Sequence, residues 1–443
     1  MVLLGGCVSV QPEPLSLQEE LNYSESLQSL YQKDDKWWQG YNDQNLNKLV
    51  ETALANNPDY LKAAININKE LYNLSLATSD LFPTVYAGLD ASSQRKIYTG
   101  DDFGDNFSGD LGLNYEIDLY GKIRNLRTAQ EFEYQATVMD KETARLSLIN
   151  SVVDLYFNLS YLQNSIDLTK KNIKAYEGIK KVAEQKYLNG KTDNLDLLQS
   201  TQSLLSEQNT LLELETQFKE QEAALKNILN ESGETKIAFA DVLEQKTVSP
   251  DLDVPVSVLA DRPDLLSAQY RLEKAFENLK AENKSWYPNI SVNGALGSSS
   301  DKARTTFDFS YIVGSVSVDL PFLDWNRVKN NIKISEADYQ ISVIDFKDTL
   351  NQALNEISYY YYAYRQSEDV YKNIEENYKN SIKISAYYRN RYEAGKDDIK
   401  DWLGAINTEN SLRKSLIEQK YQIIKYENYI YKAMGGRYKK VSA

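Results

Sequence analysis

Residues 107–118 read Phe-Ser-Gly-Asp-Leu-Gly-Leu-Asn-Tyr-Glu-Ile-Asp, and apolar and polar positions alternate strictly along them. A period of two is typical of a β-strand with one apolar face, and a tilted strand needs about 9–11 residues to cross a membrane. A turn at Tyr120-Gly121 follows, and helical spacing then continues to Lys186. The sequence therefore predicts a membrane-spanning strand that leads directly into a long helix.

The helix predicted over residues 122–188 carries a coiled-coil stripe. Val152, Leu159, Ile166 and Ile173 recur every seven residues, which is the heptad spacing of a coiled coil. At about 1.5 Å per residue this helix would be roughly 100 Å long, far longer than an ordinary globular helix. We therefore expect a mixed fold of long coiled-coil helical hairpins and a few membrane-spanning strands.

The same order of elements occurs twice, which predicts an internal structural repeat. The first repeat, residues 59–230, comprises a helix, a β-hairpin at 84–118, the long helix at 122–188 and a helix at 194–230. The second, residues 261–443, comprises a helix at 264–284, a β-hairpin at 290–320, a long helix at 326–393 and a helix at 397–434. Pro83 and Pro288 are separated by the same offset as Gly190 and Gly395. Both long hairpins lack proline, as uninterrupted helices require.

The segments outside the repeats are less regular. Residues 8–58 are predicted to be an extended leader followed by short helices, with Asp43 near the start of a helix that ends before Pro58. Residues 231–260 are predicted to be an irregular connector. In the fourth strand the apolar parity changes near Gly314, which predicts a β-bulge.

Residues 1–7 end in Leu4-Gly5-Gly6-Cys7, which resembles a bacterial lipobox. This interpretation makes Cys7 the lipidated first residue of the mature protein, whereas the alternative is a chance cysteine. Six residues are too few for a signal peptide with its apolar core of 7–15 residues, so we expect the given start to be a shortened one.

Composition excludes several functions. The chain has no histidine, one cysteine and three methionines, so the commonest general base and the usual soft metal ligands are missing. We expect no enzymatic activity, no cofactor and no metal site. The net charge of −14 argues against nucleic acid as a partner. No run of eighteen apolar residues occurs, so a membrane role must rest on the strands.

Four strands cannot cross a membrane alone. Their open edges would leave backbone groups unpaired in lipid, and the smallest spanning barrels have about eight strands. We therefore expect a barrel shared between chains and an obligate oligomer.

Several stretches resemble the TolC-type outer-membrane efflux channel family in its NodT-like lipoprotein branch. They are Trp37-Trp38 with residues 46–57, Tyr115-Glu116-Ile117-Asp118-Leu119-Tyr120-Gly121-Lys122, Leu259-Ala260-Asp261-Arg262-Pro263-Asp264, Tyr287-Pro288-Asn289-Ile290-Ser291 and Ala433-Met434-Gly435-Gly436. The resemblance covers essentially the whole chain after Cys7. It implies a homotrimer with a 12-stranded β-barrel in the outer membrane of a Gram-negative bacterium and a 12-helix periplasmic tunnel. It also implies docking to a periplasmic adaptor and an inner-membrane pump of the RND type.

The two hairpin turns, Gly190-Lys191 and Gly395-Lys396, are then expected to form the periplasmic tip and to dock the adaptor. Five aspartates cluster there, namely Asp193, Asp196, Asp397, Asp398 and Asp401. Carboxylates from several copies would make a cation-selective constriction and hold a gate. The alternative is that each aspartate caps a helix and complements its dipole. The position where some relatives carry a gating aspartate is Gly404, and a nearby arginine is replaced by Asn407, so Asp401 or Asp398 must substitute or the gate differs.

The leading functional hypothesis is a passive exit duct for drugs or other small toxic substrates. Efflux of heavy-metal ions and type I protein secretion use the same architecture and remain alternatives. A lipid-anchored periplasmic coiled-coil scaffold is an alternative from another class, but it leaves the four alternating segments unexplained. The substrate is not expected to be readable from this chain, because the inner-membrane pump selects it.

Overall fold

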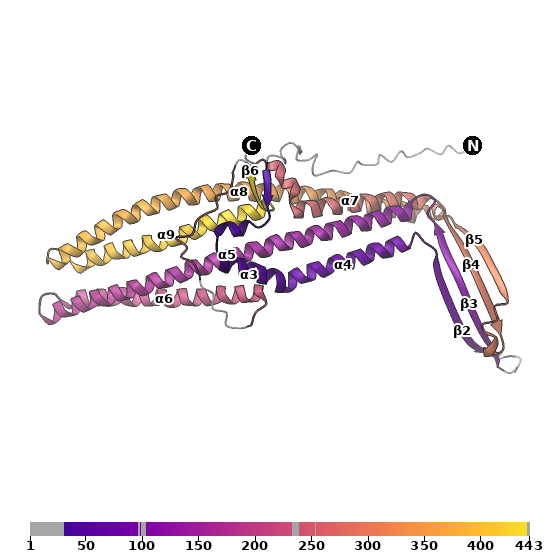
Figure 1. The fold of residues 1–443 in the computed structure, drawn as a ribbon, viewed down its shortest axis with the longest axis horizontal. Helices are drawn as coiled ribbons and strands as arrows, with labels where there is room; N and C mark the ends of the chain where they lie inside the picture. Colours follow the sequence, from indigo (N-terminus) through magenta and orange to yellow (C-terminus); the bar gives the residue numbers. More distant parts are fainter. Residues whose placement is uncertain (1–30, 96–97, 99–102, 233–238, 253, 441–443) are drawn as a thin grey trace. The chain divides into compact units, whose positions relative to one another are not determined.

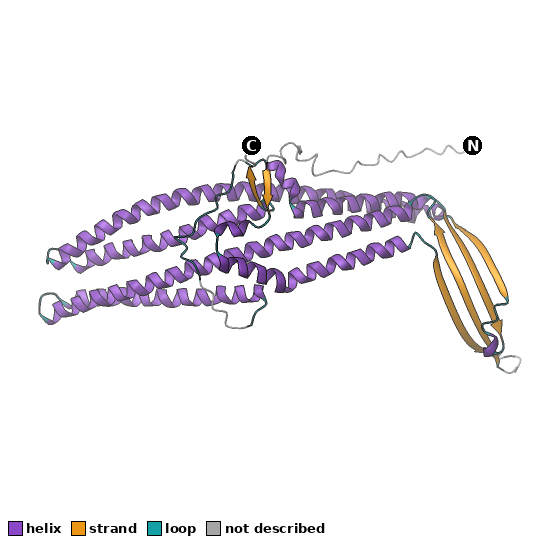
Figure 2. Ribbon diagram, viewed as in Figure 1, coloured by secondary structure: helices purple, strands orange, loops and turns teal. Residues whose placement is uncertain are grey.

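The computed structural model describes residues 31–95, 98, 103–232, 239–252 and 254–440. Helices dominate, and the strands form one four-stranded and one two-stranded sheet (Figure 2). Two compact units can be distinguished. The first, the sheet unit, comprises Ala63–Lys141 and Pro263–Leu350; the second, the hairpin unit, comprises Glu142–Arg262, residues 351–440 and the described residues before Ala63. None of the described helices is both long enough and apolar enough to cross a membrane.

The four-stranded sheet lies in the sheet unit and is antiparallel throughout. Its strands are β2 (Thr84–Gln94), β3 (Gly104–Ile117), β4 (Asn289–Ser300) and β5 (Tyr311–Asp319), in the spatial order β2-β3-β4-β5 (Figure 1). Pairing of β3 with β4 joins the two sequence halves, with Leu111 opposite Leu296. Within the described residues, β2 and β5 each pair on one side only.

Each strand presents one apolar and one polar face, as the alternation of residues 107–118 predicts. The register of the paired strands places the apolar side chains on one face of the sheet. Many of these side chains are exposed, with exposed fractions of 70% for Val85, 68% for Leu89, 80% for Ile312, 67% for Val316 and 56% for Val318. The opposite face carries mostly polar side chains, including Asp110, Asn114, Asn293, Ser315 and Ser317.

The predicted bulge in the fourth strand is wrong. β5 begins at Tyr311, not Phe307, and pairs residue for residue with β4 through Gly314 opposite Gly294. Tyr311 and Val313 lie on the polar face of the sheet. The apolar parity changes in the sequence because these two apolar residues occupy polar-face positions, and not because of an extra residue. The Tyr311 ring covers Gly297, where an added Cβ would lie 2.4 Å from the ring. Tyr86 covers Gly112 in the same way, at 2.5 Å.

Helices account for the rest of both predicted repeats. They are α3 (Gln44–Asn56), α4 (Pro58–Ser79), α5 (Lys122–Leu188), α6 (Asn194–Leu229), α7 (Pro263–Asn283), α8 (Trp325–Glu393) and α9 (Ile399–Ala433). Short 3₁₀ segments are η1 (Trp37–Tyr41), η2 (Val256–Asp261), η3 (Lys284–Trp286), η4 (Ala303–Thr305) and η5 (Pro321–Asp324). Pro58 and Pro263 occupy first positions of their helices, where the missing N–H costs nothing. Asp43 caps α3 by accepting from the N–H groups of Asn45 at 2.8 Å and Leu46 at 3.2 Å.

The two-stranded sheet was not predicted. β1 (Tyr31–Asp34) pairs antiparallel with β6 (Arg437–Lys440) in the hairpin unit. The Lys439 ammonium donates to the Asp34 carboxylate at 2.8 Å. The expected leader of residues 8–58 therefore contains a strand whose partner is the chain's last described segment. Each of these strands has only four residues and no apolar alternation, so the local sequence gives no strand signal. The strands form because they pair with each other across the length of the chain.

The main core of the hairpin unit brings the N-terminal helices against both hairpins. Fully buried side chains come from η1, α3, α5, α6 and α9, namely Trp37, Leu46, Val50, Ile149, Val152, Tyr156, Leu225, Leu229, Ile424 and Tyr431. Trp37 donates its indole N–H to Asn428 Oδ1 at 3.1 Å. Asn428 and Asn150 exchange amide-to-carbonyl hydrogen bonds of 3.0 and 3.2 Å, which fixes the register of α9 on α5.

Candidate functional site

The turns of the two long hairpins have the same backbone geometry. Gly190 has φ +67° and Gly395 has φ +70°, the left-handed conformation that glycine adopts without a steric penalty. The N–H of Gly190 donates to Tyr187 O at 2.9 Å and that of Lys191 to Lys186 O at 2.8 Å. Gly395 and Lys396 repeat both bonds at 3.0 and 2.9 Å. Each turn is therefore a Schellman motif, which ends α5 and α8 and reverses the chain.

A small core joins the two hairpins behind these turns. It contains Tyr176, Ile179, Ala183 and Leu204 from α5 and α6, and Tyr392, Ile399, Trp402 and Leu403 from α8 and α9. We call this set the tip core. The Lys186 ammonium donates to the Tyr392 carbonyl at 3.1 Å and lies 3.5 Å from the centre of the Tyr392 ring. The end of α5 is thus fixed to the end of α8.

Three of the five predicted aspartates have local partners. Asp193 caps α6 by accepting from Leu195 N at 2.9 Å, and Asp196 accepts from the Thr192 hydroxyl at 2.8 Å. Asp397 receives two hydrogen bonds from the Arg391 guanidinium, one of them 2.7 Å long, which hold its pKa below the usual range. Asp193 thus caps a helix, Asp397 forms an ion pair and Asp196 accepts from a neighbouring hydroxyl, so all three have a local structural role.

The other two aspartates are exposed. Asp398 is the N-cap of α9 but its side chain makes no capping hydrogen bond, and Asp401 lies in the first turn. Within the described ranges, neither carboxylate has a basic group within 4.0 Å. The structure therefore brings the five together at the hairpin ends but leaves Asp398 and Asp401 as the ones available to act outside their own helix.

A polar network lies next to the tip core. The Tyr176 hydroxyl donates to Asn407 Oδ1 and accepts from Asn410 Nδ2 at 3.2 Å. Burial raises the pKa of Tyr176 to about 12, so the hydroxyl stays protonated and able to donate. Glu207 of α6 accepts from Lys414 of α9 at 3.1 Å and from Asn172 at 2.9 Å. These contacts hold the first hairpin to the second over about two turns.

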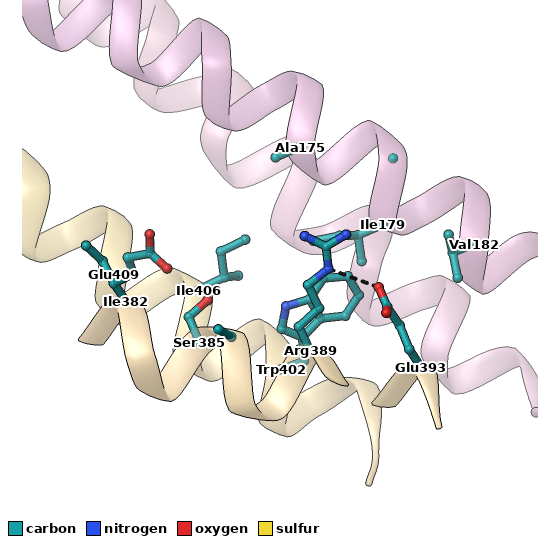
Figure 3. Close-up of a pocket in the computed structure, with 12 residues that line it drawn as sticks. Ala175, Ile179, Val182, Ile382, Ser385, Arg389, Glu393, Trp402, Ile406 and Glu409 are labelled. Atoms are coloured by element: carbon teal, nitrogen blue, oxygen red, sulfur yellow. Dashed lines mark hydrogen bonds and ion pairs between the residues drawn. The ribbon is translucent and has the colours of Figure 1, made fainter. Parts of the chain in front are cut away.

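A shallow cavity of about 590 Å³ lies between α5 and the second hairpin (Figure 3). Ile179 and Val182 of α5 face Trp402 and Ile406 of α9 across it. On α8, Arg389 and Glu393 form an exposed ion pair of 2.9 Å at its edge. The lining offers no nucleophile with a neighbouring base. In the part of the chain that the structure describes, no three metal-ligating side chains are grouped either.

The comparisons with known proteins identify the family. The sequence profile described as outer membrane efflux protein matches residues 49–231 and again residues 254–436, well over half of the chain. The chain belongs to this family. The toxin and drug export protein A of Aggregatibacter actinomycetemcomitans is 37% identical over 437 residues, which are 98% of this chain and 96% of the relative.

Two further similarities agree with this assignment. The probable outer membrane lipoprotein SilC of Salmonella typhimurium is 24% identical, over 98% of this chain and 96% of the relative. The crystal structure of CusC superposes with a TM-score of 0.86 at 20% identity, and covers 96% of this chain and 99% of that chain. The chain therefore has the TolC-type fold, as the sequence resemblance implies. Family and fold are those of channels and not of enzymes.

Family membership also gives the location. This outer membrane efflux protein resides in the outer membrane, with its helical part in the periplasm. The predicted lipidation site, Cys7, lies outside the described residues, so its modification stays a prediction.

Sequence reasoning missed the residues that fasten the two hairpins of this outer membrane efflux protein. It identified Asn407 only as a departure from the family pattern, whereas Asn407 accepts the hydrogen bond from Tyr176. Gly404, at the other departure, is exposed, and nothing lies within 4 Å of its Cβ position. The available signal was Tyr176, which lies in the companion seam beside the α5 heptad stripe and carries a hydroxyl.

Proposed function

We propose that three copies of this chain form a passive exit duct through the outer membrane, with a shared 12-stranded β-barrel continuous with a 12-helix tunnel. The observation that carries the proposal is the four-stranded sheet, which has one exposed apolar face and one polar face, and whose outer strands β2 and β5 each have one edge without a partner strand among the described residues. Lipid would surround the apolar face, but open strand edges cannot remain in lipid. Pairing β5 of one copy with β2 of the next removes every edge and places the polar face inside.

Exposed apolar stripes on the helices support the same assembly. On α4, Ile65, Tyr72 and Leu76 are 64%, 68% and 66% exposed. On α8, Ile334 and Ile341 are one heptad apart and 60% and 55% exposed. Apolar side chains at such spacing are typical of helix faces that pack against another helix. Neighbouring copies would cover them.

Aromatic residues near the strand ends support the membrane position. Phe82 and Tyr287 are 64% and 48% exposed, and Phe307 is 67% exposed. Spanning barrels carry aromatic girdles at both membrane interfaces. Buried positions would have been expected if these rings were ordinary core residues.

We further infer that the two halves are structural repeats. The identical Schellman turns at Gly190 and Gly395 support this, as does the double match of one family profile at 49–231 and 254–436. The profile matches are shifted along the chain by the same number of residues as the two turns.

The proposed gate lies at the periplasmic hairpin ends. Asp398 and Asp401 of each copy would meet at the constriction and make it selective for cations. Lys191 and Lys396, exposed beside Gly190 and Gly395, would contact the periplasmic adaptor.

Asp401→Ala should raise single-channel conductance, and Asp193→Ala, which removes only a helix cap, should not. Unchanged conductance and cation selectivity in Asp401→Ala would remove that residue from the gate.

The proposed partners are a periplasmic adaptor and an inner-membrane RND-type pump, with Cys7 acylated as a lipid anchor. The 37% identity to a relative named a toxin and drug export protein favours drugs and toxins as cargo. Cation efflux is the second candidate, because CusC is named a cation efflux system protein, and type I secretion the third.

Deletion of the gene from its host tests the exported substrate. The proposal predicts greater sensitivity to drugs and dyes, restored by a plasmid copy of the wild-type chain. Sensitivity only to Cu²⁺ or Ag⁺ would favour cation efflux, and loss of a secreted protein would favour type I secretion. No change in any of these, with a protein soluble without detergent, would favour the scaffold.

A further inference from the structure

A groove of about 850 Å³ lies in the sheet unit where the chain passes between helices and strands. Its lining includes Lys280, Lys284 and Trp286 from the end of α7 and η3, and Trp325, Lys329 and Lys333 from the start of α8. Trp286 comes just before β4, and Trp325 follows β5 after the short η5. We call it the junction groove.

The groove is basic although the whole chain carries a net charge of −14. Four lysines line it against one carboxylate, that of Glu336. Lys280 is neutralised by Glu277 at 2.7 Å, outside the lining, whereas Lys284 donates to uncharged oxygens, Gly121 O at 3.1 Å and Asn125 Oδ1. Among the residues with described positions, Lys329 and Lys333 have no carboxylate within 4.0 Å. At least three positive charges are thus without a direct counter-ion.

The spacing of these lysines is unfavourable without an anion. Lys329 and Lys333 are four residues apart on α8. Like charges at i and i+4 on a helix repel each other, which destabilises the helix. An anion bound between the two segments would relieve this repulsion and replace the missing counter-ion.

The aromatic lining indicates what kind of anion fits. Trp325 is 52% exposed and lies beneath Lys329, whose ammonium is 5.3 Å from the ring centre. Tyr287, also in the lining, stacks on Tyr120 with ring centroids 4.4 Å apart. Tryptophan and tyrosine are enriched at the headgroup level of membranes, where one end of the ring is apolar and the other polar. Val318 near the end of β5 and Leu320, which directly follows the strand, are also exposed and are suited to contact acyl chains.

We propose that the junction groove binds the phosphate headgroup of an anionic phospholipid in the periplasmic leaflet of the membrane. The ammonium groups of Lys284, Lys329 and Lys333 would donate to the phosphate oxygens, and Trp286 and Trp325 would pack beside the glycerol. This inference rests on the proposed function, because it needs the strands to cross the membrane.

Native mass spectrometry of the purified full-length oligomer, titrated with phosphatidylglycerol or phosphatidylcholine in detergent, tests the inference. The wild-type protein should bind phosphatidylglycerol in preference to phosphatidylcholine. In K329Q/K333Q the affinity for phosphatidylglycerol should fall roughly thirtyfold. Each lysine near an anionic surface contributes about 1 kcal/mol of binding free energy, and every 1.4 kcal/mol changes the dissociation constant about tenfold. The matched control is K347Q/K383Q, which removes the same charge at exposed positions elsewhere on α8 and should bind as the wild type does.

A variant that gains affinity for phosphatidylglycerol excludes misfolding as the explanation of the loss in K329Q/K333Q. Glu336→Gln removes the carboxylate from the lining and should strengthen phosphatidylglycerol binding. Equal binding of both lipids by the wild type, or equal affinity in K329Q/K333Q and its control, would overturn the inference. Uptake of inorganic phosphate without preference among lipids would do the same.

Three other outcomes distinguish a failure of this inference from a failure of the proposed function. If K329Q/K333Q lowers the oligomer mass but not the lipid affinity, the groove is covered by a second copy and the lipid assignment is wrong. If the wild type forms a conducting trimer without lipid selectivity, the inference alone fails. If it is a monomer without conductance, the proposed function fails as well.

Discussion

Glu427 is a carboxylic acid in the fully buried core of the hairpin unit, and it predicts a pH-dependent stability. Its side chain is 0% exposed. Oε1 accepts from Val248 N at 2.6 Å and from the Tyr431 hydroxyl at 3.3 Å. Oε2 is buried without a hydrogen-bond partner among the described residues. Burial raises the pKa of Glu427 from 4.5 to about 8, although Arg437 and Lys420 oppose the rise.

The sign of the effect follows from proton binding. Between pH 4.5 and about 8 the folded protein keeps the proton on Glu427 and the unfolded chain releases it. The free energy of unfolding should therefore fall as pH rises through this window, by up to about 1.4 kcal/mol per pH unit. The total loss would be at most about 5 kcal/mol, and stability should level off above the folded-state pKa.

Glu427→Gln removes this titration but keeps an oxygen that can accept from Val248 N. Thermal unfolding in detergent, followed by circular dichroism from pH 5 to pH 9, should give a flatter profile for Glu427→Gln than for the wild type. Glu418→Gln makes the same charge change at an exposed position of α9 and should keep the wild-type slope. A slope in Glu427→Gln equal to that of the wild type would show that Glu427 does not hold its proton in the folded state.

Three further predictions concern the turns, the hairpin junction and the sheet. Gly395→Ala, at φ +70°, should lower stability by roughly 1–2 kcal/mol in thermal unfolding, whereas Gly404→Ala in the helix interior should raise it by roughly 0.5–1 kcal/mol. Equal effects would contradict the Schellman assignment. Tyr176→Phe leaves two asparagines of α9 without a partner and should cost about 1–3 kcal/mol and raise single-channel conductance; unchanged conductance would separate this network from the gate. Gly112→Ala should push the tyrosine ring that covers it away from the polar face and lower conductance, and Gly314→Ala, with open space around its Cβ, should not.

Local patterns were enough to predict most of the helices and strands. α5 continues unbroken to Leu188 because it contains no proline, and it ends there because Gly190 supplies the left-handed turn. Strand β3 follows from strict alternation alone. These features depend on neighbours in the sequence, so they can be recognised before the fold is known.

Features that depend on distant neighbours were not predictable in the same way. Tyr311 reads as an apolar position, but its place on the polar face is set by Gly297 on the adjacent strand. The bond from Tyr176 to Asn407 joins two hairpins that are far apart in the sequence. Glu427 did leave a signal, since it falls among Ile424 and Tyr431 on the buried face of α9, where a carboxylate is out of place.

The mass of the detergent-extracted oligomer, determined together with its conductance in a planar bilayer, tests the proposed duct most directly. We predict a trimer that gives small, cation-selective currents, because the sheet must close between copies and Asp398 and Asp401 leave carboxylates at the constriction. A monomer that gives no current would contradict the shared barrel and favour the coiled-coil scaffold.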